Sequence, residues 1–279
     1  MRAPTNGAGA RREWSTLRHD ADLQLEALQA VFTTHAFARH WHDYYVVGLV
    51  EDGAQTFACG RATYVTPRGG LILLNPGEPH TGQAAGEAGF SYRALYPTPA
   101  HLAPLMAELG RPGELPSFPA ARIDDPALAA EIRAFHATIA GDQPPIERQG
   151  RWMALLATLI ARYSTARRPF PRVGAEPWAS AAARDYLETH YAEPVTLDVL
   201  AAHTGLSPFH LLRAFRRALG VPPHVYLESV RIRHAQRLIA AGVALAEVAY
   251  AVGFSSQSHF TTRFRRIIGV TPGRYRAAL

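Results

Sequence analysis

Residues 245–254 read Leu-Ala-Glu-Val-Ala-Tyr-Ala-Val-Gly-Phe, and part of this pattern occurs 48 residues earlier in the chain. The equivalent pairs are Leu197 and Leu245, Ala201 and Ala249, Gly205 and Gly253, and Ser207 and Ser255. A second set is offset by 49 residues: Phe215, Arg216, Arg217, Gly220, Val221, Pro223 and Tyr226 match Phe264, Arg265, Arg266, Gly269, Val270, Pro272 and Tyr275. One residue is therefore inserted between the two sets. Self-similarity on this scale indicates one supersecondary unit used twice.

Each copy predicts two helices joined by a tight turn. In the first copy, Thr196 and Ser207 are candidate N-caps, and Pro208 stands at the first position of the second helix. Gly205 supplies the left-handed residue that ends the first helix. The second copy follows the same logic, but Ala244 cannot cap a helix with its side chain, so the sequence defines that start less sharply. This arrangement is the helix-turn-helix, whose second helix enters the DNA major groove.

Helical spacing predicts which side chains of each second helix face outward. In the first copy, Leu211, Phe215 and Leu219 pack inward, and the outer face carries Phe209, Leu212, Arg213 and Arg216. In the second copy, Phe260, Phe264 and Ile268 pack inward, and the outer face carries Gln257, Ser258, His259, Thr262, Arg263 and Arg266. Guanidinium groups suit guanine and phosphates, and amides suit adenine. The side chains on these outer faces are therefore suited to hydrogen bonds with DNA bases and phosphates.

The net charge of +6 is confined to the last third of the chain, and every basic residue is arginine. Residues 1–177 have a net charge of 0, whereas residues 178–279 have a net charge of +6. Only the carboxyl-terminal part is therefore expected to meet a polyanion. The alternative is a helical bundle with a solvated charged face. Two helix-turn-helix units in tandem at the basic end favour double-stranded DNA.

The composition, 48% hydrophobic and 19% charged over 279 residues, is that of a globular chain long enough for two domains. Cys59 is the only cysteine, which excludes an internal disulfide, and no uncharged stretch is long and apolar enough to cross a bilayer. Residues 1–12 contain no apolar run. They predict a disordered tail rather than a signal peptide, and the expected location is cytoplasmic.

The amino-terminal part predicts a small β-sandwich or barrel, because short β-rich runs alternate with turn signals. These runs are Val31–Ala38, Tyr44–Val50, Gln55–Ala58, Ala62–Thr66, Leu71–Leu74 and Phe90–Tyr96. Helical periodicity follows, with one apolar stripe on Trp152–Tyr163. We expect most of this stripe to pack inside the domain, while part of it is a candidate dimer interface. Two prolines and three arginines in residues 167–174 predict a linker.

Residues 178–279 resemble the DNA-binding domain of the AraC/XylS family of bacterial transcription regulators. The second copy carries the resemblance in residues 245–254 and in Ser256, Ser258, Phe260, Phe264-Arg265, Gly269, Thr271-Pro272 and Tyr275-Arg276. The first copy does so in Leu197, Leu200-Ala201, Gly205-Leu206-Ser207, Leu211, Arg213, Phe215 and Gly220. Residues 226–239 resemble the family's connecting helix.

The resemblance implies two recognition helices in successive segments of the major groove. It assigns base contacts to Phe209, Leu212, Arg213, Gln257, Ser258, His259 and Thr262, with Ser256 and Arg263 in the same interface. Arg216, Arg217, Arg265 and Arg266 are assigned to phosphates or the surface around them. Two residues depart from the family: Leu212 cannot hydrogen-bond where relatives often carry a polar residue, and Thr262 stands where a basic residue is common. Both departures affect which bases are read.

His40-Trp41-His42 and the run Leu71–His80 resemble the two cupin motifs of the family's sensory domain, a small jelly-roll barrel that binds an effector. Metal-binding cupins add a glutamate shortly after the first two histidines, but here Val46 and Val47 occupy those places. The loss of this anionic ligand weakens a divalent site. We therefore expect no metal or other cofactor and an organic effector, although His40, His42 and His80 remain candidate ligands. The expected effector-binding residues are His40, His42, Tyr44, Tyr64, His80 and Arg93.

The expected fold is an α+β multidomain chain: an amino-terminal cupin-like β jelly-roll barrel with following helices, and a carboxyl-terminal all-α domain with two helix-turn-helix units. The expected divisions are residues 1–12 (tail), 13–100 (β-domain), 101–166 (helices and dimerisation), 167–177 (linker) and 178–279 (DNA-binding domain). The expected function is a non-enzymatic, effector-controlled regulator that binds promoter DNA as a homodimer, with RNA polymerase as a further partner. The alternatives are a metal-dependent cupin enzyme with a helical appendage and a constitutive architectural DNA binder.

Overall fold

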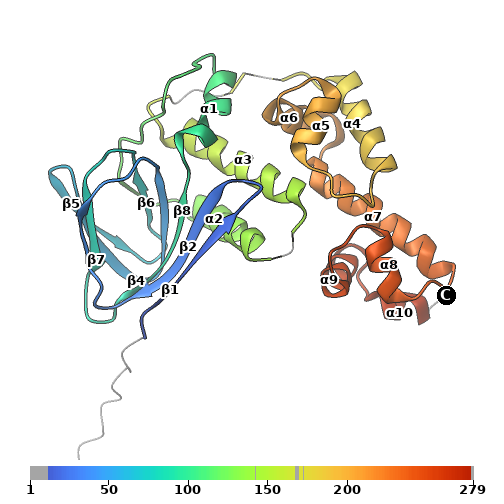
Figure 1. The fold of residues 1–279 in the computed structure, drawn as a ribbon, viewed down its shortest axis with the longest axis horizontal. Helices are drawn as coiled ribbons and strands as arrows, with labels where there is room; N and C mark the ends of the chain where they lie inside the picture. The colour runs from blue at the N-terminus through green and yellow to red at the C-terminus, as the bar shows by residue number, and fades with distance from the viewer. Residues whose placement is uncertain (1–11, 142, 167–169, 172, 278–279) are drawn as a thin grey trace, which may run out of the picture. The chain divides into compact units, whose positions relative to one another are not determined.

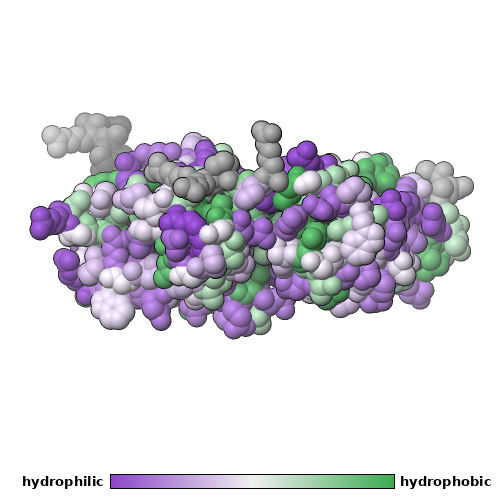
Figure 2. Space-filling model, turned by 90° about the horizontal axis from the view of Figure 1, so that it is seen from above, coloured by the Kyte–Doolittle hydropathy of each residue, from purple (hydrophilic) through white to green (hydrophobic). Residues whose placement is uncertain are grey.

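The computed structural model describes residues 12–141, 143–166, 170–171 and 173–277 (Figure 1). The chain forms two compact units, the first made of residues 1–137 and 155–169 and the second of residues 138–154 and 170–279. The expected tail therefore lies almost entirely outside the described residues, as does part of the expected linker. No helix among the described residues combines the length and apolarity needed to cross a bilayer. On the face seen in Figure 2, hydrophobic residues are scattered among hydrophilic ones.

The first unit is built on a nine-stranded antiparallel sheet. Its strands are β1 (Trp14–Asp20), β2 (Leu25–Phe32), β3 (Phe37–His40), β4 (Val46–Cys59), β5 (Ala62–Pro67), β6 (Leu71–Leu74), β7 (His80–Ala84), β8 (Phe90–Tyr96) and β9 (Arg122–Ile123). The main path runs β1-β2-β8-β4-β6-β9, and β3, β5 and β7 attach to it through the far end of β4. The expected β-rich, cupin-like domain is confirmed, but its sheet does not close into a complete barrel.

β4 is long enough to pair with two different sets of strands, one along each half of its length. Its first half pairs with β6 and β8, and its second half pairs with β5 and β7. A register shift between Val50 and Asp52 bends the strand between the two halves. The inner faces share a core that includes Val50, Phe57 and Phe90.

Helices α1 (Pro99–Glu108), α2 (Pro126–Ala140) and α3 (Pro145–Tyr163) follow the strands. On α3, Leu155, Leu156, Leu159 and Ile160 are buried within the chain, in agreement with packing rather than dimerisation for this part of the stripe. The first half of α3 belongs to the second unit. The division between the two units therefore falls within α3, and the expected boundary at residue 166 is wrong for the first half of this helix. Periodicity shows that a helix has an apolar face, but it does not show what that face contacts.

The second unit contains α4 (Pro177–Thr189), α5 (Leu197–Thr204), α6 (Pro208–Leu219), α7 (Pro223–Ala240), α8 (Leu245–Ala251), α9 (Gln257–Ile268) and α10 (Pro272–Ala277). The predicted repeat is confirmed: α5 and α6 form one helix-turn-helix, and α8 and α9 form the other. Each has its own core, and the long helix α7 contributes Leu227 to the first core and Ile232 to the second.

The helix ends follow the predicted capping chemistry with one difference. Thr196 and Ser207 accept hydrogen bonds from Val199 N and His210 N. In the second copy the cap is Ser256, which accepts from His259 N, and not Ser255, the residue matched by the repeat. The inserted residue therefore lies before the second recognition helix.

Candidate nucleic-acid interface and ligand pocket

The predicted recognition helix α9 presents an exposed polar face. Gln257, Ser258 and Thr262 are exposed, as are Arg265 and Arg266 in its last turn, while Ser256 and His259 are half-buried. The Ser256 hydroxyl lies 3.2 Å from His259 N and holds the first turn in place. A helix with a capped amino end and exposed amide and hydroxyl side chains can enter a groove and pair with base edges.

The other predicted recognition helix, α6, has its outer face covered. Arg216 and Arg217 are exposed, but Phe209 and Leu212 are only 4% and 7% exposed. The Phe170 ring meets that of Phe209 edge-on at 4.7 Å, and Leu212 belongs to the same core cluster as Ile146 of α3. The prediction of an exposed outer face is wrong for these two residues, because their covering groups lie in other parts of the chain.

Arg213 is half-buried on the same face. Its guanidinium lies 5.2 Å from the centre of the Phe209 ring and 5.7 Å from that of Phe170, and it donates to the carbonyl oxygens of Phe170 and Pro171. Cation–π contacts of this kind are worth about 0.5–1 kcal/mol at exposed sites. Arg213 is therefore held against its own chain.

Arg263 of α9 is also buried, contrary to its predicted exposure. Its guanidinium pairs with Glu147 of α3 at 3.0 Å and Glu228 of α7 at 3.4 Å. Burial raises the pKa of Glu147, but the attraction of Arg263, His224 and Arg151 outweighs it, and the net pKa is lowered. Burial dominates at Glu228, whose pKa is raised despite Arg263 and Arg266. Arg266 is exposed and also pairs with Glu228, at 2.5 Å.

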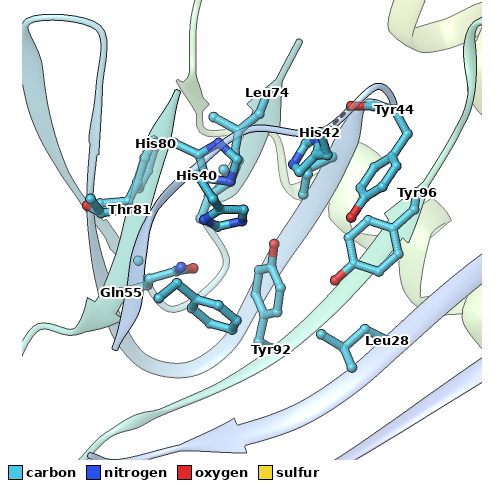
Figure 3. Close-up of a pocket in the computed structure, with 15 residues that line it drawn as sticks. Leu28, His40, His42, Tyr44, Gln55, Leu74, His80, Thr81, Tyr92 and Tyr96 are labelled. Atoms are coloured by element: carbon cyan, nitrogen blue, oxygen red, sulfur yellow. Dashed lines mark hydrogen bonds between the residues drawn. The ribbon is translucent and has the colours of Figure 1, made fainter. Parts of the chain in front are cut away.

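The first unit contains a cavity of about 150 Å³ between the inner faces of its strands (Figure 3). Its walls are mainly aliphatic and aromatic, with histidine, tyrosine, glutamine and threonine side chains at a few points. The lining residues are Leu28, Phe37, His40, His42, Tyr44, Val46, Gln55, Phe57, Ile72, Leu74, His80, Thr81, Gly82, Tyr92 and Tyr96. A concave, mostly apolar site with a few polar groups is typical of small-molecule binding.

Four of the predicted effector-binding residues line this cavity: His40, His42, Tyr44 and His80. Tyr64 does not line it, because its ring stacks on Phe57, which stands opposite it across the β4–β5 pair. Arg93 does not either, since it alternates with the inward-facing Tyr92 and pairs with Glu51 at 2.8 Å. The expected place of these two residues in the cavity is therefore wrong.

Tyr92, Tyr96 and Gln55 are lining residues that the sequence interpretation missed. Alternation along β8 would have placed Tyr92 and Tyr96 on the inner face, had the orientation of the strand been known. Gly48 is essential to this wall, because a Cβ at this position would lie 2.3 Å from the Tyr92 hydroxyl.

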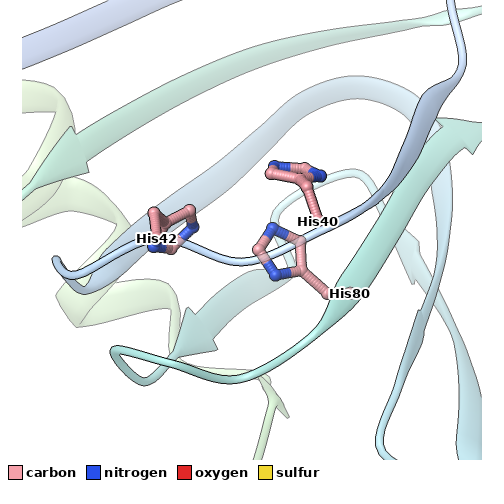
Figure 4. A group of neighbouring side chains, drawn as sticks. All are labelled: His40, His42 and His80. Carbon is pink, nitrogen blue, oxygen red and sulfur yellow. The ribbon is translucent and has the colours of Figure 1, made fainter.

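The three histidines come together from separate parts of the chain (Figure 4). His40 ends β3, His42 follows it in the connection to β4, and His80 begins β7, where it pairs directly with His40. Burial lowers the pKa of His42 and of His80, and the neighbouring histidines lower both further. Their neutral forms, which offer a nitrogen lone pair, are therefore favoured.

Comparisons with known proteins agree with this two-part architecture. The family described as an AraC-like ligand binding domain matches residues 22–156, and the family described as a helix-turn-helix domain matches residues 200–278. The uncharacterized HTH-type transcriptional regulator YbfI of Bacillus subtilis is 33% identical over 88% of this chain and 90% of its own length. The HTH-type transcriptional regulator GlxA of Rhizobium meliloti is 37% identical over 38% of this chain and 33% of its own length.

A crystal structure of the DNA-binding domain of AdpA in complex with a target DNA is 33% identical over 36% of this chain and 91% of that chain, with a TM-score of 0.35. The identification depends on the two domain matches and on the relative that spans nearly the whole chain. The chain belongs to the AraC family of helix-turn-helix transcription regulators, with an amino-terminal ligand-binding domain and a carboxyl-terminal DNA-binding domain.

Proposed function

We propose that the exposed face of α9 reads base edges and that the arginines near its carboxyl end hold phosphates. The observation that carries this assignment is the capped first turn of α9 together with the exposure of Gln257, Ser258 and Thr262. The Gln257 amide has the donor and acceptor pattern that pairs with adenine. Arg265 and Arg266 suit phosphate oxygens, whose contacts set affinity rather than sequence preference.

We propose a conditional role for α6. Arg216 and Arg217 are exposed and suit phosphates. Base contacts by Phe209 and Arg213 require that Phe170 leaves this face, whereas Leu212 stays in the core with Ile146 of α3. Two binding states of the second unit follow: one that reads DNA mainly through α9, and one in which both recognition helices are available.

We propose that a small-molecule effector in the cavity of the first unit shifts the population of these two states. We also propose that the protein acts in the cytoplasm as a homodimer and contacts RNA polymerase. A ligand shifts such an equilibrium only if it binds one state better than the other. The charge distribution supports separate sites for the effector and for DNA, since the chain has no net charge before residue 178 and is basic from residue 178 onward.

The test is a gel-shift titration of the full chain on the DNA upstream of its own gene and on a random fragment of equal length, at several salt concentrations. Gln257→Ala is expected to cost about 1–3 kcal/mol on the specific site and less on random DNA. Arg265→Ala is expected to weaken both and to reduce the salt slope by about 1. Arg18→Ala, in exposed β1, is the control for loss of one positive charge. Equal losses on both fragments for Gln257→Ala would contradict base reading.

An enzymatic role is the second candidate, and the convergence of three histidines in the cavity is the observation that favours it. It gives no account of the tandem repeat. Oxygen uptake by the iron-loaded chain in the presence of small carboxylic acids tests it directly, and sustained turnover would support an enzyme.

A further inference from the structure

We propose that His40, His42 and His80 bind a divalent first-row transition metal ion, such as Zn²⁺, and that open coordination positions of this ion face the ligand cavity. The ligand class that follows is a small molecule with an anionic oxygen donor on an apolar body. This site concerns the ligand-binding unit alone and does not depend on the proposed DNA contacts.

Each of the three imidazole rings is oriented by a hydrogen bond to a backbone carbonyl oxygen. His40 Nδ1 lies 2.8 Å from the Ala38 carbonyl oxygen, His42 Nδ1 lies 2.7 Å from that of Tyr44, and His80 Nδ1 lies 2.9 Å from that of Glu78. A carbonyl oxygen only accepts, so each Nδ1 carries the proton and each Nε2 keeps its lone pair. Metal-ligating histidines typically have one ring nitrogen held by a carbonyl or carboxylate, which fixes both tautomer and orientation.

The three histidines converge on one point. One ring nitrogen from each of the three residues lies within 4.8 Å of the others, and the rings face one another in Figure 4. Two nitrogens bound to the same tetrahedral Zn²⁺ stand about 3.3 Å apart, given Zn–N bonds of about 2.0–2.1 Å. The remaining movement is small, and His40 is exposed at the cavity rim, where a small shift of its ring meets little steric resistance.

One ring nitrogen of the cluster, His42 Nε2, is buried without a hydrogen-bond partner among the described residues. A buried acceptor without a partner loses its hydration without compensation. The ring of His42 is also held in place, because it stacks on Tyr44 at 4.0 Å between ring centres and an interplanar angle of 5°. A metal ion on the cavity side would satisfy this lone pair.

The donor set determines the kind of ion and its ligand. Imidazole nitrogens suit Zn²⁺, Fe²⁺, Ni²⁺ and Cu²⁺, whereas Mg²⁺ and Ca²⁺ prefer oxygen ligands. The nearby Glu78 is not part of the cluster, because its carboxylate accepts from the Asn75 side chain at 3.0 Å. Three neutral ligands leave the double positive charge of the ion uncompensated, and a three-ligand site keeps at least one open position.

The cavity around this position is apolar with tyrosine hydroxyls. Leu28, Leu74 and Phe57 supply apolar walls, and Figure 3 shows the Tyr92 hydroxyl pointing toward the histidine rings. An anionic oxygen donor would bind the ion while its carbon skeleton lies against the aliphatic side chains. A carboxylate with a small apolar body has this chemistry.

The test is metal binding by the full chain after chelator treatment. Calorimetric titration with Zn²⁺ is expected to show one ion per chain, and Co²⁺ is expected to give the visible absorption of a low-coordinate histidine site. His40→Ala and His42→Ala should each weaken binding by at least tenfold, whereas His35→Ala, an exposed histidine in the connection from β2 to β3, should leave it unchanged. Because His40 is exposed, its loss does not threaten the fold, and a thermal unfolding scan verifies this for every variant.

The open position is tested on the Co²⁺-loaded chain with azide and acetate as probes. Both are expected to change the visible spectrum, and the change should disappear in His40→Ala. Absence of stoichiometric binding, or equal affinity in the wild type and His40→Ala, would overturn the metal site. A spectrum insensitive to both anions would overturn the open position. If the wild-type chain binds metal but shows no sequence-selective DNA binding in the gel-shift assay, the result would count against the proposed DNA contacts alone.

Discussion

Arg263 on α9 is bound to Glu147 on α3, 116 residues earlier, with a nitrogen–oxygen distance of 3.0 Å and both side chains largely buried. Gln149, two residues after Glu147, accepts a hydrogen bond from Leu197 N at 2.6 Å and donates one to Asp198 at 2.7 Å. The first half of α3 therefore contacts both helix-turn-helix copies and is an integral part of the second unit. Its Glu147 carboxylate neutralises Arg263, which the sequence predicts to lie in the DNA interface.

Glu147→Gln is expected to destabilise the second unit by about 2 kcal/mol, the scale of a hydrogen bond to a charged group, because Arg263 then keeps only Glu228 as a buried counter-charge. Urea denaturation followed by fluorescence measures this change. Glu114→Gln, which removes the exposed partner of Arg111, is the matched control and should have no measurable effect. Equal stability of Glu147→Gln and the wild type would show that the pair does not hold this unit together.

Phe170→Ala is expected to raise DNA affinity by up to about tenfold, because the ring contacts over Phe209 and Arg213, worth about 0.5–1.5 kcal/mol, no longer compete with DNA. A fluorescence anisotropy titration on the specific site measures it. The gain should vanish in the double variant with Arg213→Ala. An affinity unchanged by Phe170→Ala would mean that α6 does not need to be uncovered for binding.

Gly48→Ala is expected to disturb the ligand cavity, because the added Cβ would force the Tyr92 ring from its place. Displacing a packed aromatic ring costs about 1–3 kcal/mol. Calorimetric unfolding measures the loss of stability. Gly86→Ala is the control, since no atom lies within 4 Å of its added Cβ and its φ is unstrained. Equal stability of the two variants would contradict the tight contact at Gly48.

The first unit is expected to lose stability as the pH falls from neutral toward 4. Burial, together with repulsion from Arg93, lowers the pKa of His136 from 6.5 to about 4. Below pH 6.5 the unfolded chain takes up a proton that the folded chain accepts only near pH 4, so folding becomes less favourable in this window, by about 2 kcal/mol between pH 7 and pH 5. Urea denaturation at both pH values measures the loss. His136→Gln should reduce the pH dependence, and His19→Gln, at an exposed position, should not.

Local signals in the sequence were sufficient for much of the fold. The repeat around Gly205 and Gly253 predicted both helix-turn-helix copies, since capping, left-handed glycines and apolar spacing act within a few residues. The same interpretation placed His40, His42 and His80 in one pocket through their resemblance to cupin motifs. The repeat matched Ser255 with the capping residue Ser207, whereas Ser256 caps α9, because a one-residue insertion in a turn has no periodic signature.

Nonlocal contacts decided the rest. The resemblance and the charge distribution placed DNA binding in the last third of the chain, and the amino-acid order alone determined the helices that carry it. Whether Phe209, Leu212 and Arg263 are exposed depended on Phe170, Ile146 and Glu147, which are distant in sequence. Likewise, Tyr92 faces the cavity and Arg93 does not, because pairing between β8 and β4 sets the orientation of the strand. Helices and caps form from neighbouring residues, whereas burial and convergence exist only once separate segments have packed together.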